Sequence, residues 1–485
     1  MKNNTLTKVF WGIMLALLSV SCGDFLKEEV YTQYDPETFL QTESGINSVL
    51  VASYSNMQVT ANMRDRMYTL QEFPGDIMWE WGGSFASTAI LFMNFNWDSQ
   101  STVFSTPWQQ YYASIRNANS LLDNIDNVKT LTADKIKQYK AEAMFIRAAD
   151  YYYLWEIFGP VPLITTAKDL NMEPLRATDE EFNNFMSQEL QAAANDLPLT
   201  QSLWGKATKG AALAMLGKFY LNTLQWQKAA DLNKQVMDLN KYKLFSGDIK
   251  NMFAVQNEVN DETILVGPAL PTSSHNNNYM AHAFPPNYPI QSNWINYGAM
   301  FCVYNDWVKT YDPKDKRLGW FCFNYTEPNG KVHDLLNPND AGKAVRCFKF
   351  VPDPAGISEK HGNDVPMIRY AEVLLNRAEA LNEINGPTQE SIDLLNLIRK
   401  RAGVSDYTMA DLTSKGIMRD ALLKERGWEF VAEGMRRMDL IRQGKLISSA
   451  IARGATNAKD YMTRFPIPLN EIKANPKLVQ NPNYN

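Results

Sequence analysis

Tryptophan and tyrosine stand close to carboxylate and amide side chains in two segments that show no helical period. The first segment, residues 73–107, contains Asp76, Trp79, Trp81 and Trp97. The second segment, residues 251–364, contains Trp294, Asn296, Tyr297, Trp320 and Tyr325. A sugar offers apolar C–H faces that rest on aromatic rings, and hydroxyl groups that bond to Asp, Asn and Arg side chains. We therefore predict that at least two of these residues contact a ligand, with burial in the core as the alternative for each.

A second set of residues has the types that catalysis uses. Glu425, Glu429 and Glu433 recur every four residues, with Arg426, Arg436 and Arg437 nearby. On a helix this spacing places the three carboxylates on one face, where they are either catalytic groups or partners in ion pairs. We interpret them as structural ion pairs, because they fall in a segment of helical scaffold.

Residues 82–86, Gly-Gly-Ser-Phe-Ala, approach the Gly-x-Ser-x-Gly turn of serine hydrolases, with Ala86 in place of the last glycine. That turn needs a preceding strand, a following helix, and an acid and a histidine downstream. The four histidines have no obvious partner, so we interpret this pattern as a flexible glycine loop. The chain has no Gly-rich phosphate loop, His-Glu-x-x-His or Cys-x-x-Cys pattern. We therefore predict no catalytic residue, no metal and no cofactor.

The first residues have the pattern of an export signal. Two lysines precede an apolar stretch that is too short to cross a bilayer, which predicts a signal peptide over residues 1–21. The sequence Leu-Ser-Val-Ser-Cys that ends at Cys22 resembles a bacterial lipobox, with Ser19 where leucine is usual. Acylation of Cys22 would hold the protein at a membrane surface. The alternative is a plain secreted protein that is cleaved close to this point.

Composition narrows the possible partners. The chain has 485 residues and a formal net charge of −5, which argues against nucleic acid, because phosphate binding needs concentrated Lys and Arg. Beyond Cys22, three cysteines remain: Cys302, Cys322 and Cys347. Their spacing fits no zinc pattern. Two of them could pair in an exported protein, but we predict buried free thiols.

The remaining sequence is mostly helical. Helices are expected over 108–125, 133–158, 207–224, 368–385 and 388–402, and Thr178 with Glu181 predicts a capping box at the start of another. Trp108, Trp155 and Trp428 lie on expected helices and are predicted to be core. The spacing of Leu216, Gly217, Tyr220 and Ala229 matches a tetratricopeptide repeat, and 368–385 with 388–402 forms a looser second pair.

Two long irregular stretches interrupt these helices, at 73–107 and 251–364. Loops of this length in a compact protein are usually functional. We therefore expect a single globule over 22–485, with a helical part at 22–250. Its second part, 251–485, then combines the loop-rich ligand-binding stretch with C-terminal helices.

Several blocks, in order over nearly the whole chain, resemble the SusD/RagB family of outer-membrane nutrient-binding lipoproteins. They are Cys22-Gly23-Asp24-Phe25-Leu26; Trp108-Gln109-Gln110-Tyr111-Tyr112 with Ile115 and Asn119; Phe158-Gly159-Pro160-Val161-Pro162-Leu163; Arg369-Tyr370-Ala371-Glu372; Glu425-Arg426 with Glu429-Phe430; and Phe465-Pro466-Ile467-Pro468 with Asn475-Pro476. The resemblance implies a mostly α fold, in which tetratricopeptide-like helix pairs carry long ligand-binding loops and a few short strands.

The resemblance also implies a function. Such proteins face the cell exterior, anchored in the outer membrane by lipid, and pass a nutrient to a TonB-dependent barrel of the SusC type. Their ligands are typically oligosaccharides or polysaccharides, and the family is not known for catalysis. Two other classes stay open. One is a tetratricopeptide-type lipoprotein scaffold that binds only proteins, and the other is a glycan-degrading enzyme, which needs two carboxylates about 5 to 10 Å apart.

Overall fold

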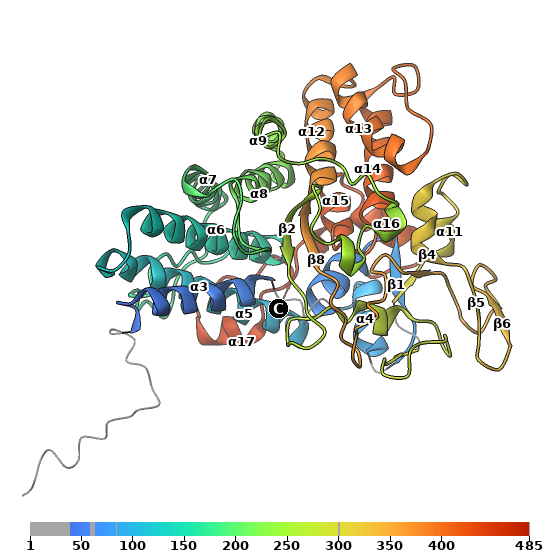
Figure 1. The fold of residues 1–485 in the computed structure, drawn as a ribbon, viewed down its shortest axis with the longest axis horizontal. Helices are drawn as coiled ribbons and strands as arrows, with labels where there is room; N and C mark the ends of the chain where they lie inside the picture. The colour runs from blue at the N-terminus through green and yellow to red at the C-terminus, as the bar shows by residue number, and fades with distance from the viewer. Residues whose placement is uncertain (1–38, 59–63, 84, 299–300, 485) are drawn as a thin grey trace, which may run out of the picture.

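The computed structural model describes residues 39–58, 64–83, 85–298 and 301–484 (Figure 1). Cys22 and the signal peptide expected over 1–21 lie outside the described residues. The structure is mostly α-helical with a few short strands, as predicted. Helices of the first half stack side by side on the left of Figure 1, and the irregular segments and strands gather on the right.

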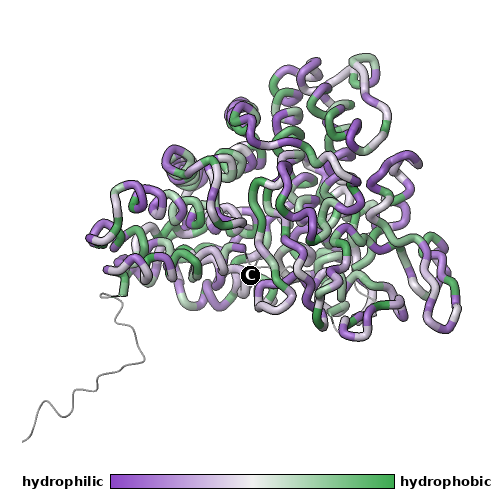
Figure 2. The backbone as a smooth tube through the Cα atoms, viewed as in Figure 1, coloured by the Kyte–Doolittle hydropathy of each residue, from purple (hydrophilic) through white to green (hydrophobic). Residues whose placement is uncertain are grey.

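The stacked helices contact one another in chain order. They are α3 (Glu43–Gln58), α5 (Thr102–Asn124), α6 (Ala133–Phe158), α7 (Asp179–Asp196), α8 (Lys209–Asn222) and α9 (Trp226–Asp238). Each helix contacts the next, and α9 continues the stack onto α12 (Tyr370–Asn385). This serial packing is typical of helical repeats, in which each unit contacts only its neighbours. Figure 2 shows hydrophobic and hydrophilic residues alternating along these helices.

Local sequence explains where these helices begin and end. The capping box predicted for Thr178 and Glu181 forms at the start of α7. Helix α6 ends at Gly159, whose φ of 75° is a conformation that glycine adopts freely. A Cβ atom on Gly217 of α8 would lie 2.8 Å from the Asn233 side chain of α9. The small residue therefore allows the close approach that the repeat spacing predicted.

The C-terminal helices follow the irregular segment. They are α12, α13 (Gln389–Ala402), α14 (Lys415–Glu429), α15 (Arg436–Arg442), α16 (Leu446–Ala452) and α17 (Leu469–Ala474). Helix α17 returns to pack below α5, at the lower left of Figure 1. One hydrophobic cluster contains buried residues from Leu40 to Leu478. Among the described residues, no helix has the length and apolar character that crossing a bilayer requires.

The strands form two-stranded antiparallel ribbons: β1 (Met78–Glu80) with β3 (Phe301–Val303), β2 (Thr263–Gly267) with β8 (Val365–Arg369), β4 (Phe321–Cys322) with β7 (Arg346–Cys347), and β5 (Asn324–Thr326) with β6 (Val332–Asp334). Short helices connect them: η2 (Arg64–Glu72), α4 (Ala86–Met93), α10 (Tyr279–Ala283) and α11 (Asn305–Val308), with single 3₁₀ turns between. The 73–107 stretch is thus more ordered than its sequence indicated, because it contains β1, α4 and the start of α5.

Buried ion pairs join the irregular segment to the C-terminal helices. Glu425 pairs with Arg317 and Arg399, Glu429 with Arg317, Arg369 and Arg401, and Glu433 with Lys349 and Arg369. Burial raises the pKa of Glu429, but the surrounding guanidinium groups outweigh burial and hold it below its ordinary range. The structural interpretation of the three glutamates is confirmed. Their partners come mainly from other segments and not from Arg426, Arg436 and Arg437.

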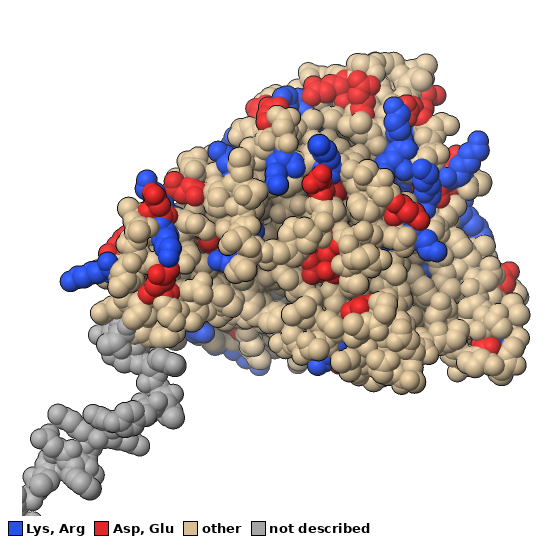
Figure 3. Space-filling model, viewed as in Figure 1, with Lys and Arg blue, Asp and Glu red and all other residues tan. Residues whose placement is uncertain are grey.

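The cysteines of the described residues form no disulfide, and the surface carries charges of both signs. Cys302, Cys322 and Cys347 are free, as predicted. Cys302 and Cys347 are buried, whereas Cys322 is partly exposed, so the prediction of a buried thiol is wrong for Cys322. Basic and acidic side chains are interspersed over the face that Figure 3 shows.

Candidate functional site

The β1–β3 ribbon positions two of the predicted tryptophans. Successive side chains of a strand point to opposite faces, and accordingly Met78 and Glu80 are buried whereas Trp79 and Trp81 are partly exposed. Trp79 stacks on Tyr304, which follows β3, with ring centroids 5.9 Å apart and an interplanar angle of 19°. The Trp79 indole N–H has no hydrogen-bond partner among the described residues. Trp79 and Trp81 therefore form a partly exposed aromatic surface, although the Trp79 indole N–H itself is buried.

A lysine lies next to this surface. The ammonium group of Lys343 is 5.3 Å from the ring centroid of Trp81, which is a cation–π contact. The Lys343 backbone has a φ of 74°, a conformation unusual for a residue other than glycine. Asp340 holds the preceding turn, because its Oδ1 accepts a hydrogen bond of 2.7 Å from the Gly342 amide. The loop thus holds a positive charge over the indole.

His333 fixes the base of the same loop. Its Nδ1 lies 2.5 Å from Asp340 Oδ1, and its Nε2 lies 2.8 Å from Glu327 Oε1. Tyr325 stacks on the imidazole with ring centroids 4.5 Å apart. Burial acts to lower the pKa of His333, but the hydrogen bonds to the two carboxylates outweigh burial and raise it.

A chain of ring contacts connects the predicted Tyr297 to the β1–β3 ribbon. The Tyr297 ring lies 4.9 Å from His282, and His282 stacks on Phe301 of β3 at the same distance. Phe301 in turn is the register partner of Glu80, whose side chain lies on the buried face of the ribbon, opposite Trp79. Tyr297 exposes 40% of its surface. These contacts therefore join Tyr297 to the buried side of the ribbon and not to the face that carries Trp79 and Trp81.

Two other predicted residues shape the segment that carries Tyr297. Trp294 is partly exposed and stacks on Phe284, with centroids 6.0 Å apart and an angle of 11°. Asn296 donates a hydrogen bond of 2.8 Å to the Pro285 carbonyl and accepts one of 2.7 Å from the Gly298 amide. Asn296 is therefore occupied in holding the loop.

The remaining predicted residues are engaged within the fold. Trp97 is buried and donates to the Tyr484 hydroxyl at 3.0 Å. Trp320 is fully buried and donates to the Ile249 carbonyl at 2.8 Å. Tyr325 is buried under the loop that it supports, and Asp76 is paired with Arg436. These four side chains are therefore occupied within the fold.

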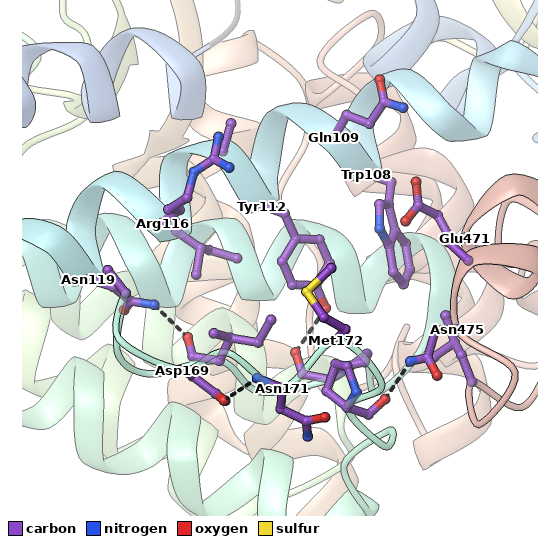
Figure 4. Close-up of a pocket in the computed structure, with 18 of the residues that line it drawn as sticks. Trp108, Gln109, Tyr112, Arg116, Asn119, Asp169, Asn171, Met172, Glu471 and Asn475 are labelled. Atoms are coloured by element: carbon purple, nitrogen blue, oxygen red, sulfur yellow. Dashed lines mark hydrogen bonds between the residues drawn. The ribbon is translucent and has the colours of Figure 1, made fainter.

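The structure also contains a cavity of about 600 Å³ that the sequence did not indicate (Figure 4). Its walls are α5, the segment 162–174 and the region of α17. Trp108 and Tyr112 point from α5 toward that segment. Trp108 is buried in the core, as predicted, and it is also a wall of this cavity. The one available signal was the spacing of Trp108, Tyr112 and Arg116, which fall four residues apart on one helical face.

Three polar groups of the cavity are bound to its own walls. The Tyr112 hydroxyl donates to the Pro162 carbonyl, Asn119 to Ile164 and Asn475 to Pro174, each at 2.8 Å. These bonds hold the 162–174 segment against α5 and α17. No cluster of three or more His, Cys, Asp or Glu side chains suited to a metal ion occurs in the described ranges.

Two protein-family models match parts of this chain. A family model described as "Starch-binding associating with outer membrane" matches residues 24–221, and one described as "SusD family" matches residues 323–484. The cavity lies within the matched segments, whereas Trp294 and Tyr297 lie in the part that neither model matches.

Individual relatives agree over most of the chain. "SusD-like protein P25" of Formosa agariphila is 24% identical over 96% of this chain and 97% of its own. "Starch-binding protein SusD" of Bacteroides thetaiotaomicron is 21% identical, with both chains fully covered. The solved structure of surface glycan-binding protein A from Bacteroides thetaiotaomicron in complex with laminarihexaose has a TM-score of 0.75 and 22% identity, covering 91% of this chain and 99% of that one. The order of the sequence blocks, the fold and both family models agree, and the chain belongs to the SusD/RagB family.

Proposed function

We propose that this protein is a surface-exposed outer-membrane lipoprotein that binds a glycan through the aromatic surface of Trp79 and Trp81. It passes the glycan to a TonB-dependent barrel of the SusC type. The observation that carries the binding step is the β1–β3 ribbon, which holds Trp79 and Trp81 on one partly exposed face. Sugar C–H faces stack on such rings, and Lys343 supplies a donor for hydroxyl or acidic groups.

The relatives support a glycan as the ligand class. One is named a starch-binding protein, and a solved neighbour holds laminarihexaose. The anchor at Cys22 and the barrel rest on the sequence and on the family resemblance. Catalysis is not part of the proposal, because Glu425, Glu429 and Glu433 are buried and paired with cations.

A glycan panel tests this function. Affinity electrophoresis of the purified protein in gels that contain starch, laminarin or other polysaccharides should show retardation by at least one of them, and calorimetry then gives the Kd. A protein that binds none of these but captures proteins would favour the tetratricopeptide-type scaffold, a class consistent with the stack from α3 to α9. Release of reducing ends from a bound glycan would instead favour the enzyme.

A further inference from the structure

The segment 167–176 displays apolar side chains at the surface. Leu170, Met172 and Leu175 expose 85%, 83% and 66% of their surface. Consecutive turns fix the segment, because the Asn171 amide donates to Asp169 at 2.9 Å and the Glu173 amide to Asn171 at 3.0 Å. Arg176 ties its end to the Pro160 carbonyl at 2.8 Å. Apolar groups held in water by an ordered backbone mark an interaction surface.

This segment is also one wall of the cavity in Figure 4, in which Met172 lines the space beside Tyr112. The amide and hydroxyl groups of Asn119, Asn475 and Tyr112 are already bonded to wall carbonyls. The interior therefore presents mainly ring faces and aliphatic carbons, and it has the size of a typical ligand site. Such a space suits large apolar side chains better than hydroxyl-rich sugars, whose recognition needs free polar partners.

One carboxylate at the edge of this cavity lacks a cation. Burial raises the pKa of Glu471 above its ordinary value, and the Trp108 indole that donates to it is its only partner in the described part of the chain. A carboxylate that is partly removed from water is stabilised by an opposite charge. Glu471 is thus complementary to a basic group that comes from outside.

We propose that the cavity and the 167–176 segment form a docking site for a partner protein that inserts a large apolar side chain against Trp108 and Tyr112 and places a Lys or Arg beside Glu471. The rim mixes Arg116 with Asp169 and Glu471, whereas a membrane-binding surface carries a cluster of basic residues. The site uses α5 and α17, and the glycan surface uses β1 and β3. It therefore lies beyond the proposed glycan binding and does not depend on it.

Selection of peptides tests this site directly. Random peptides displayed on phage are selected against the purified protein and counter-selected against the Met172→Asp variant. We expect the selected peptides to pair a large apolar residue with Lys or Arg. Their Kd should rise roughly tenfold in Glu471→Gln, which keeps an acceptor for Trp108 but removes the charge, and more than tenfold in Met172→Asp.

Ile417→Asp is the matched control, because Ile417 is also an exposed apolar residue but lies on α14. It should leave peptide binding unchanged, and all three variants should keep the melting temperature and the glycan affinity of the parent. Failure to select any peptide would overturn the proposal. So would equal binding to the Met172→Asp and Ile417→Asp variants, or competition for the cavity by a glycan or by phospholipid vesicles. None of these results bears on glycan binding at Trp79 and Trp81, which is measured separately.

Discussion

Asp76 and Arg436 form a two-pronged ion pair between residues 360 positions apart: Nε donates to Oδ1 at 2.6 Å and Nη2 to Oδ2 at 3.0 Å. The same guanidinium donates to the Leu423 carbonyl and lies 4.9 Å from the Trp307 ring. Burial acts to lower the pKa of Arg436, but the attraction of Asp76 is larger than this effect and raises the pKa of Arg436 above its ordinary value. The pair joins the chain just before β1 to α15, and we infer that Asp76 positions the strand that carries Trp79.

Replacing Asp76 by Ala should therefore destabilise the protein. The change leaves the buried Arg436 without its carboxylate, and breaking one side of such a pair costs about 3 kcal/mol. Denaturant unfolding measures this loss, with Asp306→Ala, an exposed acid, as the control. A variant with parental stability but lost glycan binding would show that Asp76 contacts the ligand directly.

Alanine substitutions should separate the predicted tryptophans into two groups. Trp79→Ala and Trp81→Ala should weaken glycan binding by about 1–3 kcal/mol each, the size of a binding hot spot, with little change in the melting temperature. Trp97→Ala and Trp320→Ala should instead lower the free energy of unfolding by about 3–5 kcal/mol, because both rings are buried.

Trp226→Ala serves as the control for this series, because Trp226 is partly exposed at the start of α9, away from the β1–β3 ribbon. It should leave glycan binding unchanged. If Trp79→Ala and Trp81→Ala lower the stability of the protein but leave its glycan affinity unchanged, the aromatic-surface proposal is contradicted.

The sequence predicted the helical scaffold better than the site. Capping residues and apolar periodicity are local signals, and they located α6, α7, α8 and α13 to within a few residues. The roles of the tryptophans depend on distant partners. Trp97 is buried because Tyr484 and Phe465, which lie near the C-terminal end of the sequence, pack against it. Trp81, by contrast, stays partly exposed just after β1.

The cavity was missed for the same reason. Trp108 has the periodicity of a core residue, and its wall role requires α17 and the 162–174 segment, which lie far apart in the sequence. The register of β1 with β3 is also non-local, and no local pattern in residues 73–107 indicated that a strand would hold Trp79 and Trp81 on one face.

The clamp around His333 predicts a pH dependence. The pKa of His333 is raised in the folded protein, so its contribution to stability is fully present below its unfolded pKa of about 6.5 and is lost as the pH rises through the folded value. Hydrogen bonds from His333 and Asn287 lower the pKa of Glu327. Hydrogen bonds from the Gly342 amide and His333 outweigh burial and lower the pKa of Asp340. Their contribution is lost as the pH falls through these lowered values.

The stability difference between the parent and His333→Gln should accordingly be largest in mildly acidic solution and shrink toward alkaline pH. Unfolding measured from pH 5 to pH 9 checks this, with His275→Gln as the control, because the His275 ring bonds to Ser55 and Ser274 and to no carboxylate among the described residues. A difference that grows with pH would contradict the clamp.

Replacing Cys22 by Ser should release the protein from the membrane fraction. The sequence predicts one lipid attachment point, and the described residues contain no helix suited to cross the bilayer. Fractionation with detection by immunoblot measures the shift. A Cys22→Ser variant that stays membrane-bound after its signal peptide is cleaved would show that the lipobox interpretation is wrong.

The last prediction concerns the barrel. A lipid at Cys22 would confine the protein to the membrane plane, where encounters with a barrel occur at high effective concentration. The helical stack would supply a rigid docking face, and a stable cap should bury well over about 1,000 Å² of total surface.

Purification of the tagged protein from its native outer membrane in mild detergent should therefore recover a large barrel in near-equal amount. The soluble Cys22→Ser variant, expressed in the same cells, should recover far less, because confinement to the membrane is lost. Recovery of the anchored protein alone would contradict the import complex, and it would leave a free-standing glycan binder if the glycan panel is positive.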